Sequence, residues 1–114
     1  MKTIARPEAA AFRPCAIVPS YRHVTRLPGV IDALVAQNLP VFVIDDGNDG
    51  DVRTAIATLA NKPRAVTVIR RDQNGGKGAA IKTGFRAAID AGFTHALQVD
   101  ADGQHDLADA PLFI

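Results

Sequence analysis

The sequence predicts an α/β fold in which βαβ units build a mostly parallel sheet. Short apolar segments rich in β-branched residues alternate along the chain with segments whose apolar residues recur at helical spacing. The run Val41–Ile44 is apolar at every position, which is typical of a strand buried on both faces of a parallel sheet. A chain of 114 residues, 47% of them hydrophobic, has room for one small globular domain.

Four strands and three helices are predicted. The strands are expected at 15–19, 41–44, 65–69 and 94–99, and the helices at 25–38, 51–60 and 79–91. Pro28 suits the first turn of the first helix, Pro63 separates the second helix from the next strand, and Gly92 is expected to cap the third helix.

The two ends of the chain differ from its middle. Residues 1–14 lack the continuous apolar segment of a signal peptide and are expected to form a flexible leader. Residues 15–114 are expected to be the N-terminal part of a larger domain. Asp109 and Pro111 would begin another helix, but the apolar residues Leu112–Ile114 that follow have no evident packing partner, which suggests truncation.

Charge and cysteine content exclude several classes of protein. The formal net charge of +1 produces no field that would attract nucleic acid, so no nucleic-acid partner is expected. No run approaches the ~20 apolar residues that a membrane-spanning helix needs. Cys15 is the single cysteine and lies in an apolar run, so we expect a core residue rather than a nucleophile, in a cytoplasmic protein.

Oxygen-bearing side chains follow the last predicted strand. Asp100, Asp102 and Gln104 stand at alternate positions and therefore point to one side while the backbone stays extended. Carboxylate and amide oxygens suit a hard divalent cation such as Mg²⁺, which would also stabilise the charge on a departing diphosphate. The alternative is that the aspartates only form a turn.

Other polar residues follow the other strands, and ligands of open α/β sheets bind at those ends. Asp45 and Asp46 could accept hydrogen bonds from a nucleoside or be solvated loop acids. The loop Asn74–Gly78, with Lys77, could approach a phosphate or be a plain turn, because it matches no standard phosphate-loop spacing. Tyr21 could stack on a base or cover the sheet edge.

The remaining candidates are weaker. His105 could contact a substrate, whereas His95 lies within a strand pattern and is expected to be structural. Arg64, Arg70 and Arg71 are expected to form a solvated face.

Four segments resemble, in the same order, the motifs of the family 2 glycosyltransferases with the GT-A fold. They are Ala16–Tyr21, Val43–Asp49, Asn74–Gly78 and Asp100–His105. The last segment is similar to the Asp-Ala-Asp-x-Gln-His motif of the polyprenyl- and dolichol-phosphate sugar transferases. The resemblance implies that the chain supplies the Rossmann-like, nucleotide-binding half of a GT-A domain.

The resemblance also implies inverting transfer of a sugar from a UDP- or GDP-linked donor to an acceptor hydroxyl, assisted by Mg²⁺ or Mn²⁺. The expected nucleotide-sugar-binding residues are Pro19, Tyr21, His23, Asp45, Asp46, Lys77, Asp100 and Ala101. The expected metal ligands are Asp100, Asp102 and Gln104. A lipid carrier is one candidate acceptor, which would place the full-length protein at the inner face of a membrane.

The chain also departs from the family pattern. Arg22-His23 stands where Asn-Glu is common, and Asn48 stands where serine is usual. The general base is expected beyond Ile114, so the isolated chain is not expected to turn over efficiently.

Three alternative functions compete with this prediction. A sugar nucleotidyltransferase would carry a glycine-rich loop after the first strand, where this chain has Pro19-Ser20-Tyr21. A receiver-like signalling module would carry its acidic residues after the first and third strands, not after the second and fourth. A degenerate module that binds nucleotide without reacting stays open.

Overall fold

A four-stranded sheet with only parallel strand pairs forms the centre of the molecule. The computed structural model describes residues 12–22, 24–61 and 65–101. The strand order is β4-β3-β2-β5. The strands are β2 (Pro14–Ser20), β3 (Val41–Asp46), β4 (Val66–Arg71) and β5 (His95–Gln98).

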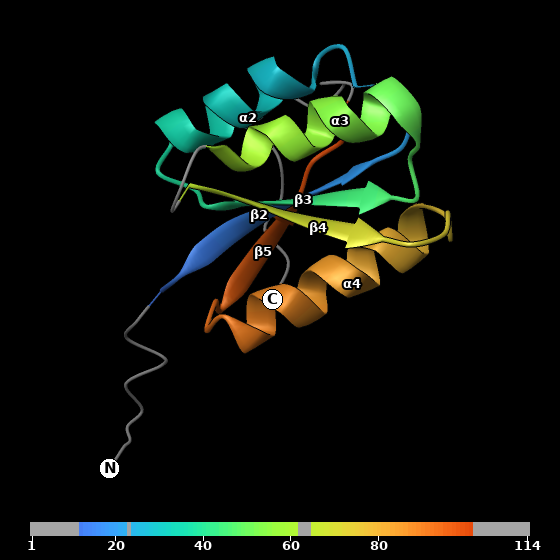
Figure 1. Ribbon diagram of the computed structural model, residues 1–114. Helices are drawn as coiled ribbons and strands as arrows, with labels where there is room; N and C mark the ends of the chain where they lie inside the picture. Colours follow the sequence, from blue (N-terminus) through green and yellow to red (C-terminus); the bar gives the residue numbers. More distant parts are fainter. Residues whose placement is uncertain (1–11, 23, 62–64, 102–114) are drawn as a thin grey trace.

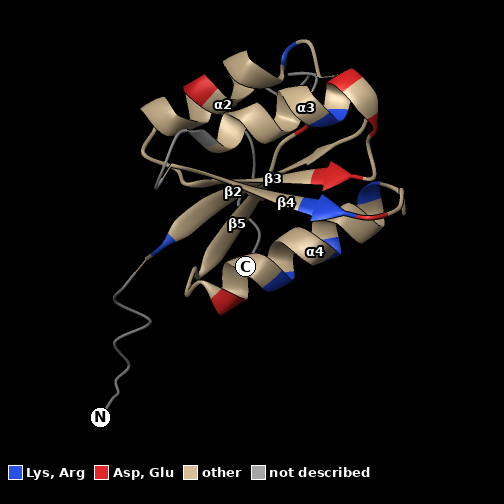
Figure 2. Cartoon of the chain, viewed as in Figure 1, with Lys and Arg blue, Asp and Glu red and all other residues tan. Residues whose placement is uncertain are grey.

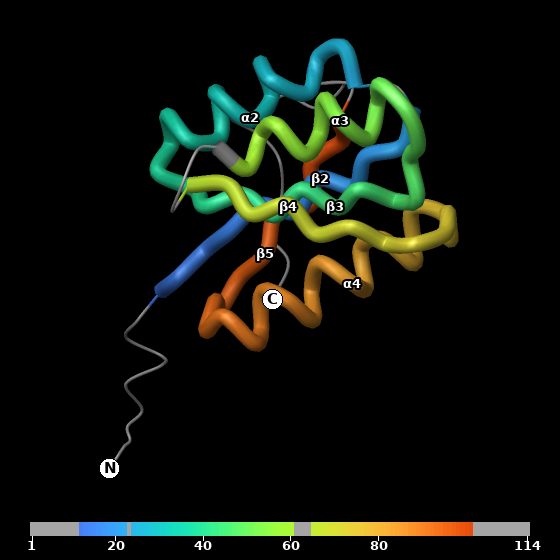
Figure 3. Tube along the Cα trace, viewed as in Figure 1, coloured from blue at the N-terminus to red at the C-terminus, as the bar shows by residue number. Residues whose placement is uncertain are grey.

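Helices cover both faces of this sheet, so that the domain has three layers (Figure 1). Helices α2 (Leu27–Ala36) and α3 (Gly50–Thr58) lie on one face, and α4 (Lys77–Asp90) lies on the other. A short 3-10 helix, η1 (Leu59–Asn61), follows α3. The trace in Figure 3 shows the chain returning from β3 to β4 over one face, through α3, and from β4 to β5 over the other, through α4.

A separate apolar core lies on each face of the sheet, between the sheet and the helices that cover it. On the side of α2 and α3, the largest buried side chains include Ile31, Leu34 and Ile56, which pack against residues of the sheet. On the side of α4, Ile17 and Ile44 lie under the helix with no exposed surface. Burial of both faces explains why the central strands β2 and β3 have continuous apolar runs instead of alternating apolar and polar residues.

The predicted fold class and element order are confirmed, and the differences lie at element ends. None exceeds two residues, and one that bears on the site is at α4, which begins at Lys77 instead of residue 79. Gly76, Lys77 and Gly78 do not suggest a helix start by propensity. The start depends instead on a contact with a distant residue, Asp46, described below.

The ends of α2 and α4 have the same cap. Gly92 and Asn38 both have positive φ angles, of 88° and 62°. After α4, the Gly92 and Phe93 amides donate to Ile89 and Ala88, both at 3.0 Å. This is the Schellman arrangement, and it confirms Gly92 as the predicted cap.

Candidate functional site

The carboxyl ends of the strands form one edge, where the polar residues collect. In the register of the sheet, Ser20 pairs with Asp45 and Asp45 pairs with Arg70. Strand β5 reaches nearly the same level, because Gln98 pairs with Ile17 and Asp100 follows two residues later. Figure 2 shows acidic and basic residues side by side at the tips of β3 and β4.

Asp45 is buried and bonded on both of its oxygens. Its side chain is 3% exposed. Oδ1 accepts hydrogen bonds from the Asn48 backbone amide at 3.0 Å and from Asn48 Nδ2 at 2.7 Å, and Oδ2 accepts one from Arg70 at 3.3 Å. The carboxylate therefore joins the ends of β3 and β4 and shapes the turn after β3.

Asn48 connects this turn to the loop after β2. The residue is 3% exposed, and its Nδ2 also donates to the Ser20 carbonyl oxygen at 2.9 Å. Its Oδ1 accepts a 2.8 Å bond from the Arg22 amide. Arg70 also donates to the Asn48 carbonyl oxygen at 2.8 Å. Asn48 is thus a hydrogen-bonding centre for three strand ends.

Asp46 holds the glycine-rich loop that precedes α4. Its Oδ1 accepts from Arg71 Nε at 2.8 Å and from the Gly75 amide at 3.1 Å, and its Oδ2 accepts from the Gly76 amide at 3.0 Å. An anion at a helix N-terminus is favourable, and here a carboxylate of the protein itself takes that position. This contact explains the early start of α4.

The backbones of the two loops also touch. A Cβ at Gly47 would overlap the Asn74 amide nitrogen and the Gln73 carbonyl carbon, and Gly47 has a φ of 75°. Any other residue there would push the loops apart and strain the backbone. On the far side, Arg71 donates to Thr83 in α4 at 2.6 Å.

Lys77 and Asp100 bring α4 and β5 together at this edge. Lys77 Nζ lies 2.6 Å from Asp100 Oδ1. The ammonium-bearing side chain is 53% exposed and the carboxylate-bearing side chain is 21% exposed. A carboxylate and an ammonium therefore meet at the rim of the site, where both can reach solvent.

The loop after β2 presents an aromatic ring at the same edge. Tyr21 is 39% exposed, and the guanidinium of Arg22 lies 4.9 Å from its ring centroid. Arg22 has a φ of 63°, held by the bond of its amide to Asn48. Pro19, which precedes the loop, is half-buried in β2.

Several predicted site residues lie outside the described part of the chain: His23, Asp102, Gln104 and His105. Asp100 and Ala101 are described, and Ala101 is buried. Within the described residues, no group of three or more His, Cys, Asp or Glu side chains is arranged to hold a metal ion. The Asp100 carboxylate is chemically suited to a hard divalent cation, and one of its oxygens contacts the Lys77 ammonium.

One prediction about this edge was wrong. Arg70 and Arg71 do not form a solvated face: their side chains are 27% exposed and paired with Asp45 and Asp46. Arg64 lies outside the described residues. The sequence did contain a signal for this pairing. Strand β3 ends in two acids and β4 ends in two arginines, and a parallel register places these ends side by side.

Asn48 stood out in the sequence only as a departure from the serine that is usual in the family. Its burial and its bonds to Ser20, Arg22 and Asp45 appear only in the folded chain.

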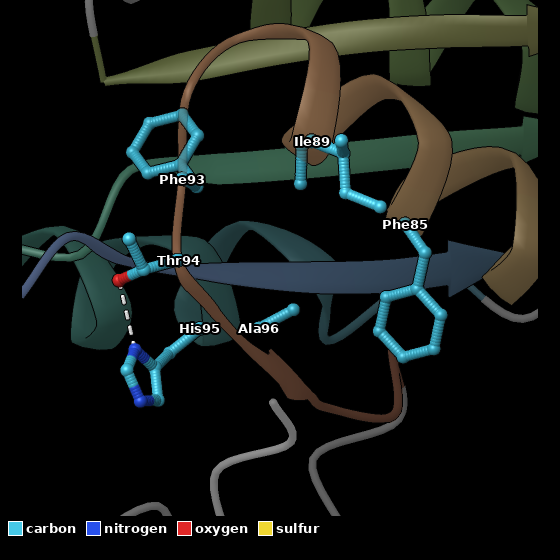
Figure 4. A pocket seen from close by; sticks show the side chains of 7 residues that line it. Phe85, Ile89, Phe93, Thr94, His95 and Ala96 are labelled. Atoms are coloured by element: carbon cyan, nitrogen blue, oxygen red, sulfur yellow. Dashed lines mark hydrogen bonds between the residues drawn. The ribbon is translucent and has the colours of Figure 1, made fainter. Parts of the chain in front are cut away.

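A separate apolar pocket lies between α4 and the start of β5, with a volume of about 160 Å³ (Figure 4). Phe85, Ile89 and Phe93 line it together with Thr94, His95 and Ala96. It is at the opposite end of β5 from Asp100 and contains none of the predicted site residues. His95 contacts the Phe12 ring, with a centroid distance of 4.6 Å, and bonds to Thr94.

Cys15 has no exposed surface and lies under α4. Burial raises the pKa of its thiol from 9.0 to about 11. Because the thiolate is the reactive form, this supports the prediction of a core residue.

Several families of α/β proteins have polar residues at the carboxyl ends of their strands, and comparison with known proteins identifies the family of this chain. The model of glycosyl transferase family 2 matches residues 15–112, which is most of the chain. The chain belongs to glycosyl transferase family 2. This confirms the resemblance of the four motif segments and the GT-A type of α/β fold.

Several relatives have names that mention a polyprenyl or dolichyl phosphate or a polyprenol monophosphate. The chain is 30% identical to the polyprenol monophosphomannose synthase of Mycolicibacterium smegmatis over 82% of its length. It is 29% identical to the undecaprenyl-phosphate mannosyltransferase of Micrococcus luteus over 88% of its length. It is 28% identical to the UDP-N-acetylglucosamine–dolichyl-phosphate N-acetylglucosaminyltransferase of Methanococcus voltae over 78% of its length.

The family 2 chain covers only part of these proteins. It spans 42%, 36% and 41% of the Micrococcus, Mycolicibacterium and Methanococcus relatives. In the described part of the chain, no helix has both the length and the apolar character needed to cross a bilayer.

Proposed function

We propose that this chain binds the donor of a family 2 glycosyltransferase that moves a sugar from a nucleotide diphosphate to a lipid phosphate. The observation that carries the proposal is the strand edge of a family 2 domain. It brings an exposed Tyr21, the network of Asp45 and Asp46, and the Lys77–Asp100 pair to one side of the sheet. The printed names of the relatives support the choice of a lipid-phosphate acceptor.

In this proposal the base is contacted by Pro19, which is half-buried near the end of β2, and by Tyr21, which is exposed in the loop that follows. Asp45 and Asp46 belong to the same proposed nucleotide site, at the end of β3. Their existing bonds hold the neighbouring loops, and each carboxylate oxygen can accept more than one hydrogen bond. His23 and Ala101 remain proposed contacts.

Lys77 and the metal site face the diphosphate. Asp100, Asp102 and Gln104 would hold Mg²⁺ or Mn²⁺, and a bound ion would offset the charge of the leaving diphosphate. Lys77, at the start of α4, supplies a positive charge within reach of Asp100. In the transfer, the bond from the sugar anomeric carbon to the diphosphate oxygen breaks, and a bond to the acceptor oxygen forms on the opposite face.

A lipid-phosphate acceptor changes the expectation of an acceptor hydroxyl. A phosphate monoester has a second pKa near ~6, so its oxygen is already largely ionised at neutral pH. Such an acceptor needs less help from a general base, a role to which we assign no residue in this chain.

The first experiment is a titration of UDP and GDP, with and without Mn²⁺, against the whole chain. Asp102→Ala and Asp100→Asn are expected to remove the enhancement of nucleotide binding by Mn²⁺. Asp90→Asn is the matched control, because Asp90 is an exposed acid at the far end of α4. Its affinity should equal that of the unchanged chain.

Two results would contradict the proposal. One is nucleotide affinity that Mn²⁺ does not change. The other is an equal response in Asp102→Ala and in the control. A preference for UDP or GDP in the same titration would identify the donor base.

A further inference from the structure

We propose that Lys77 acts as a resident substitute for the divalent cation at Asp100. In the protein without metal, its ammonium neutralises the carboxylate. When a divalent cation binds Asp100, Lys77 is displaced and its charge becomes available to the diphosphate. The inference rests on the proposed function, since it takes Asp100 as a metal ligand.

The first observation is the contact itself. Lys77 Nζ and Asp100 Oδ1 are 2.6 Å apart, a short, charge-assisted hydrogen bond. The partners come from different elements, the first residue of α4 and the segment after β5. The Lys77 ammonium thus lies where a metal ion bound to Asp100 Oδ1 would have to lie.

The second observation is that the two partners differ in exposure. The Asp100 side chain is 21% exposed, whereas the Lys77 side chain is 53% exposed. The acid is therefore the more fixed partner. The lysine has a flexible four-carbon stem and can swing its charge away without disturbing the core.

The third observation is that α4 gains nothing from a lysine at this position. Lys77 is the first residue of a 14-residue helix, where the helix dipole disfavours a positive charge. The first turn of α4 contains no acidic residue that would compensate. The Asp100 carboxylate offsets this cost directly at the Lys77 ammonium, in addition to the Asp46 carboxylate at the amides that precede the helix.

The other cation beside the loop does not have this freedom. Arg71 is 27% exposed and bonded to Asp46 at 2.8 Å and to Thr83 at 2.6 Å. It serves to hold the loop. Lys77 is therefore the residue on α4 whose charge can exchange between Asp100 and a bound anion.

This exchange has opposite consequences for metal and for nucleotide. Lys77 competes with a metal ion for Asp100, so removing its charge should strengthen metal binding. The same removal should weaken nucleotide binding once metal is present, because the displaced ammonium is no longer available to the diphosphate. A lysine with a purely structural role would give neither change.

The test measures Mn²⁺ affinity of the whole chain without nucleotide, by electron paramagnetic resonance of free Mn²⁺. Lys77→Gln is expected to bind Mn²⁺ about two- to fivefold more tightly, the range that an exposed ion pair is worth. Lys82→Gln is the matched control, since Lys82 is an exposed lysine on the same helix and the charge change is equal. Its Mn²⁺ affinity should not change. Thermal melts establish that both variants are folded.

Three outcomes would overturn the inference, and they separate its failure from that of the proposed function. If Asp100→Asn lowers Mn²⁺ affinity but Lys77→Gln behaves like Lys82→Gln, only the exchange is wrong. If Lys77→Gln weakens Mn²⁺ binding, the lysine supports the metal site instead of competing for it. If neither the unchanged chain nor any variant binds Mn²⁺, the proposed metal site fails as well.

Discussion

Arg71 Nε and Asp46 Oδ1 form a 2.8 Å ion pair that joins the end of β4 to the end of β3. The same carboxylate accepts the Gly75 and Gly76 amides, so the pair also fixes the start of α4. Arg71 and the two glycine amides are all hydrogen-bond donors to this carboxylate. The network therefore requires a group that only accepts hydrogen bonds.

Asp46→Asn is expected to destabilise the fold by about 2–3 kcal/mol, because one carboxylate oxygen becomes an amide that faces a donor. Urea denaturation measures the change in the free energy of unfolding. Hydrogen exchange at the Gly75 and Gly76 amides should also accelerate. Asp72→Asn, at an exposed acid in the same loop, is the control and should change the stability by less than about 0.5 kcal/mol. Equal effects of the two substitutions would exclude the anchoring role.

Asn48→Asp is expected to cost about 3 kcal/mol or more at neutral pH. It replaces the Nδ2 donor with an oxygen that faces Asp45 Oδ1 at 2.7 Å and the Ser20 carbonyl at 2.9 Å, both acceptors, in a buried place. Chemical denaturation gives the value. The control is Asn38→Asp, at the exposed cap of α2, where the cost should be less than about 1 kcal/mol. A stable Asn48→Asp variant would mean that the loops after β2 and β3 do not depend on this side chain.

Two glycines of α4 should respond in opposite directions to alanine. A Cβ at Gly84 would overlap Ile17 Cγ2 in the core, so Gly84→Ala is expected to destabilise by about 1–3 kcal/mol despite its better helix propensity. Nothing lies within 4 Å of a Cβ at Gly78, so Gly78→Ala should stabilise by about 0.5 kcal/mol. Thermal and urea unfolding report both. The same sign at both positions would argue against the close packing of α4 on β2.

Cys15 should make the stability fall at high pH. Burial raises the folded-state pKa of its thiol to about 11, above the ordinary value of 9.0 for an exposed thiol. Between pH 9 and 11 the folded chain therefore keeps a proton on Cys15 that the unfolded chain releases. The full stability is present below pH 9, and the free energy of unfolding falls as the pH rises toward 11. The slope should approach about 1.4 kcal/mol per pH unit.

Comparison with Cys15→Ala isolates this effect from other groups that titrate in the same range. The difference in the free energy of unfolding between the two proteins should change with pH only above pH 9. A difference that is constant from pH 8 to 10.5 would show that the thiol is not buried as described.

Local sequence patterns determined the architecture and which residues gather at the edge of the candidate site. The pattern of apolar residues within a short segment indicates which side chains are buried, so strands and helices could be predicted one by one. Examples are the continuous run Val41–Ile44 and the helical spacing of Val30, Ile31 and Leu34. Because parallel strands direct their carboxyl ends to one edge, the residues that follow them were expected together.

The partners at that edge came only from the folded chain. Arg70 and Arg71 meet Asp45 and Asp46 through the register of β3 and β4, about 25 residues apart in sequence. Lys77 meets Asp100 because α4 begins at the same edge of the sheet where β5 ends. Hydrogen bonds and ion pairs depend on distances of a few ångströms between segments remote in the chain, and hydrophobic periodicity carries no information about those distances.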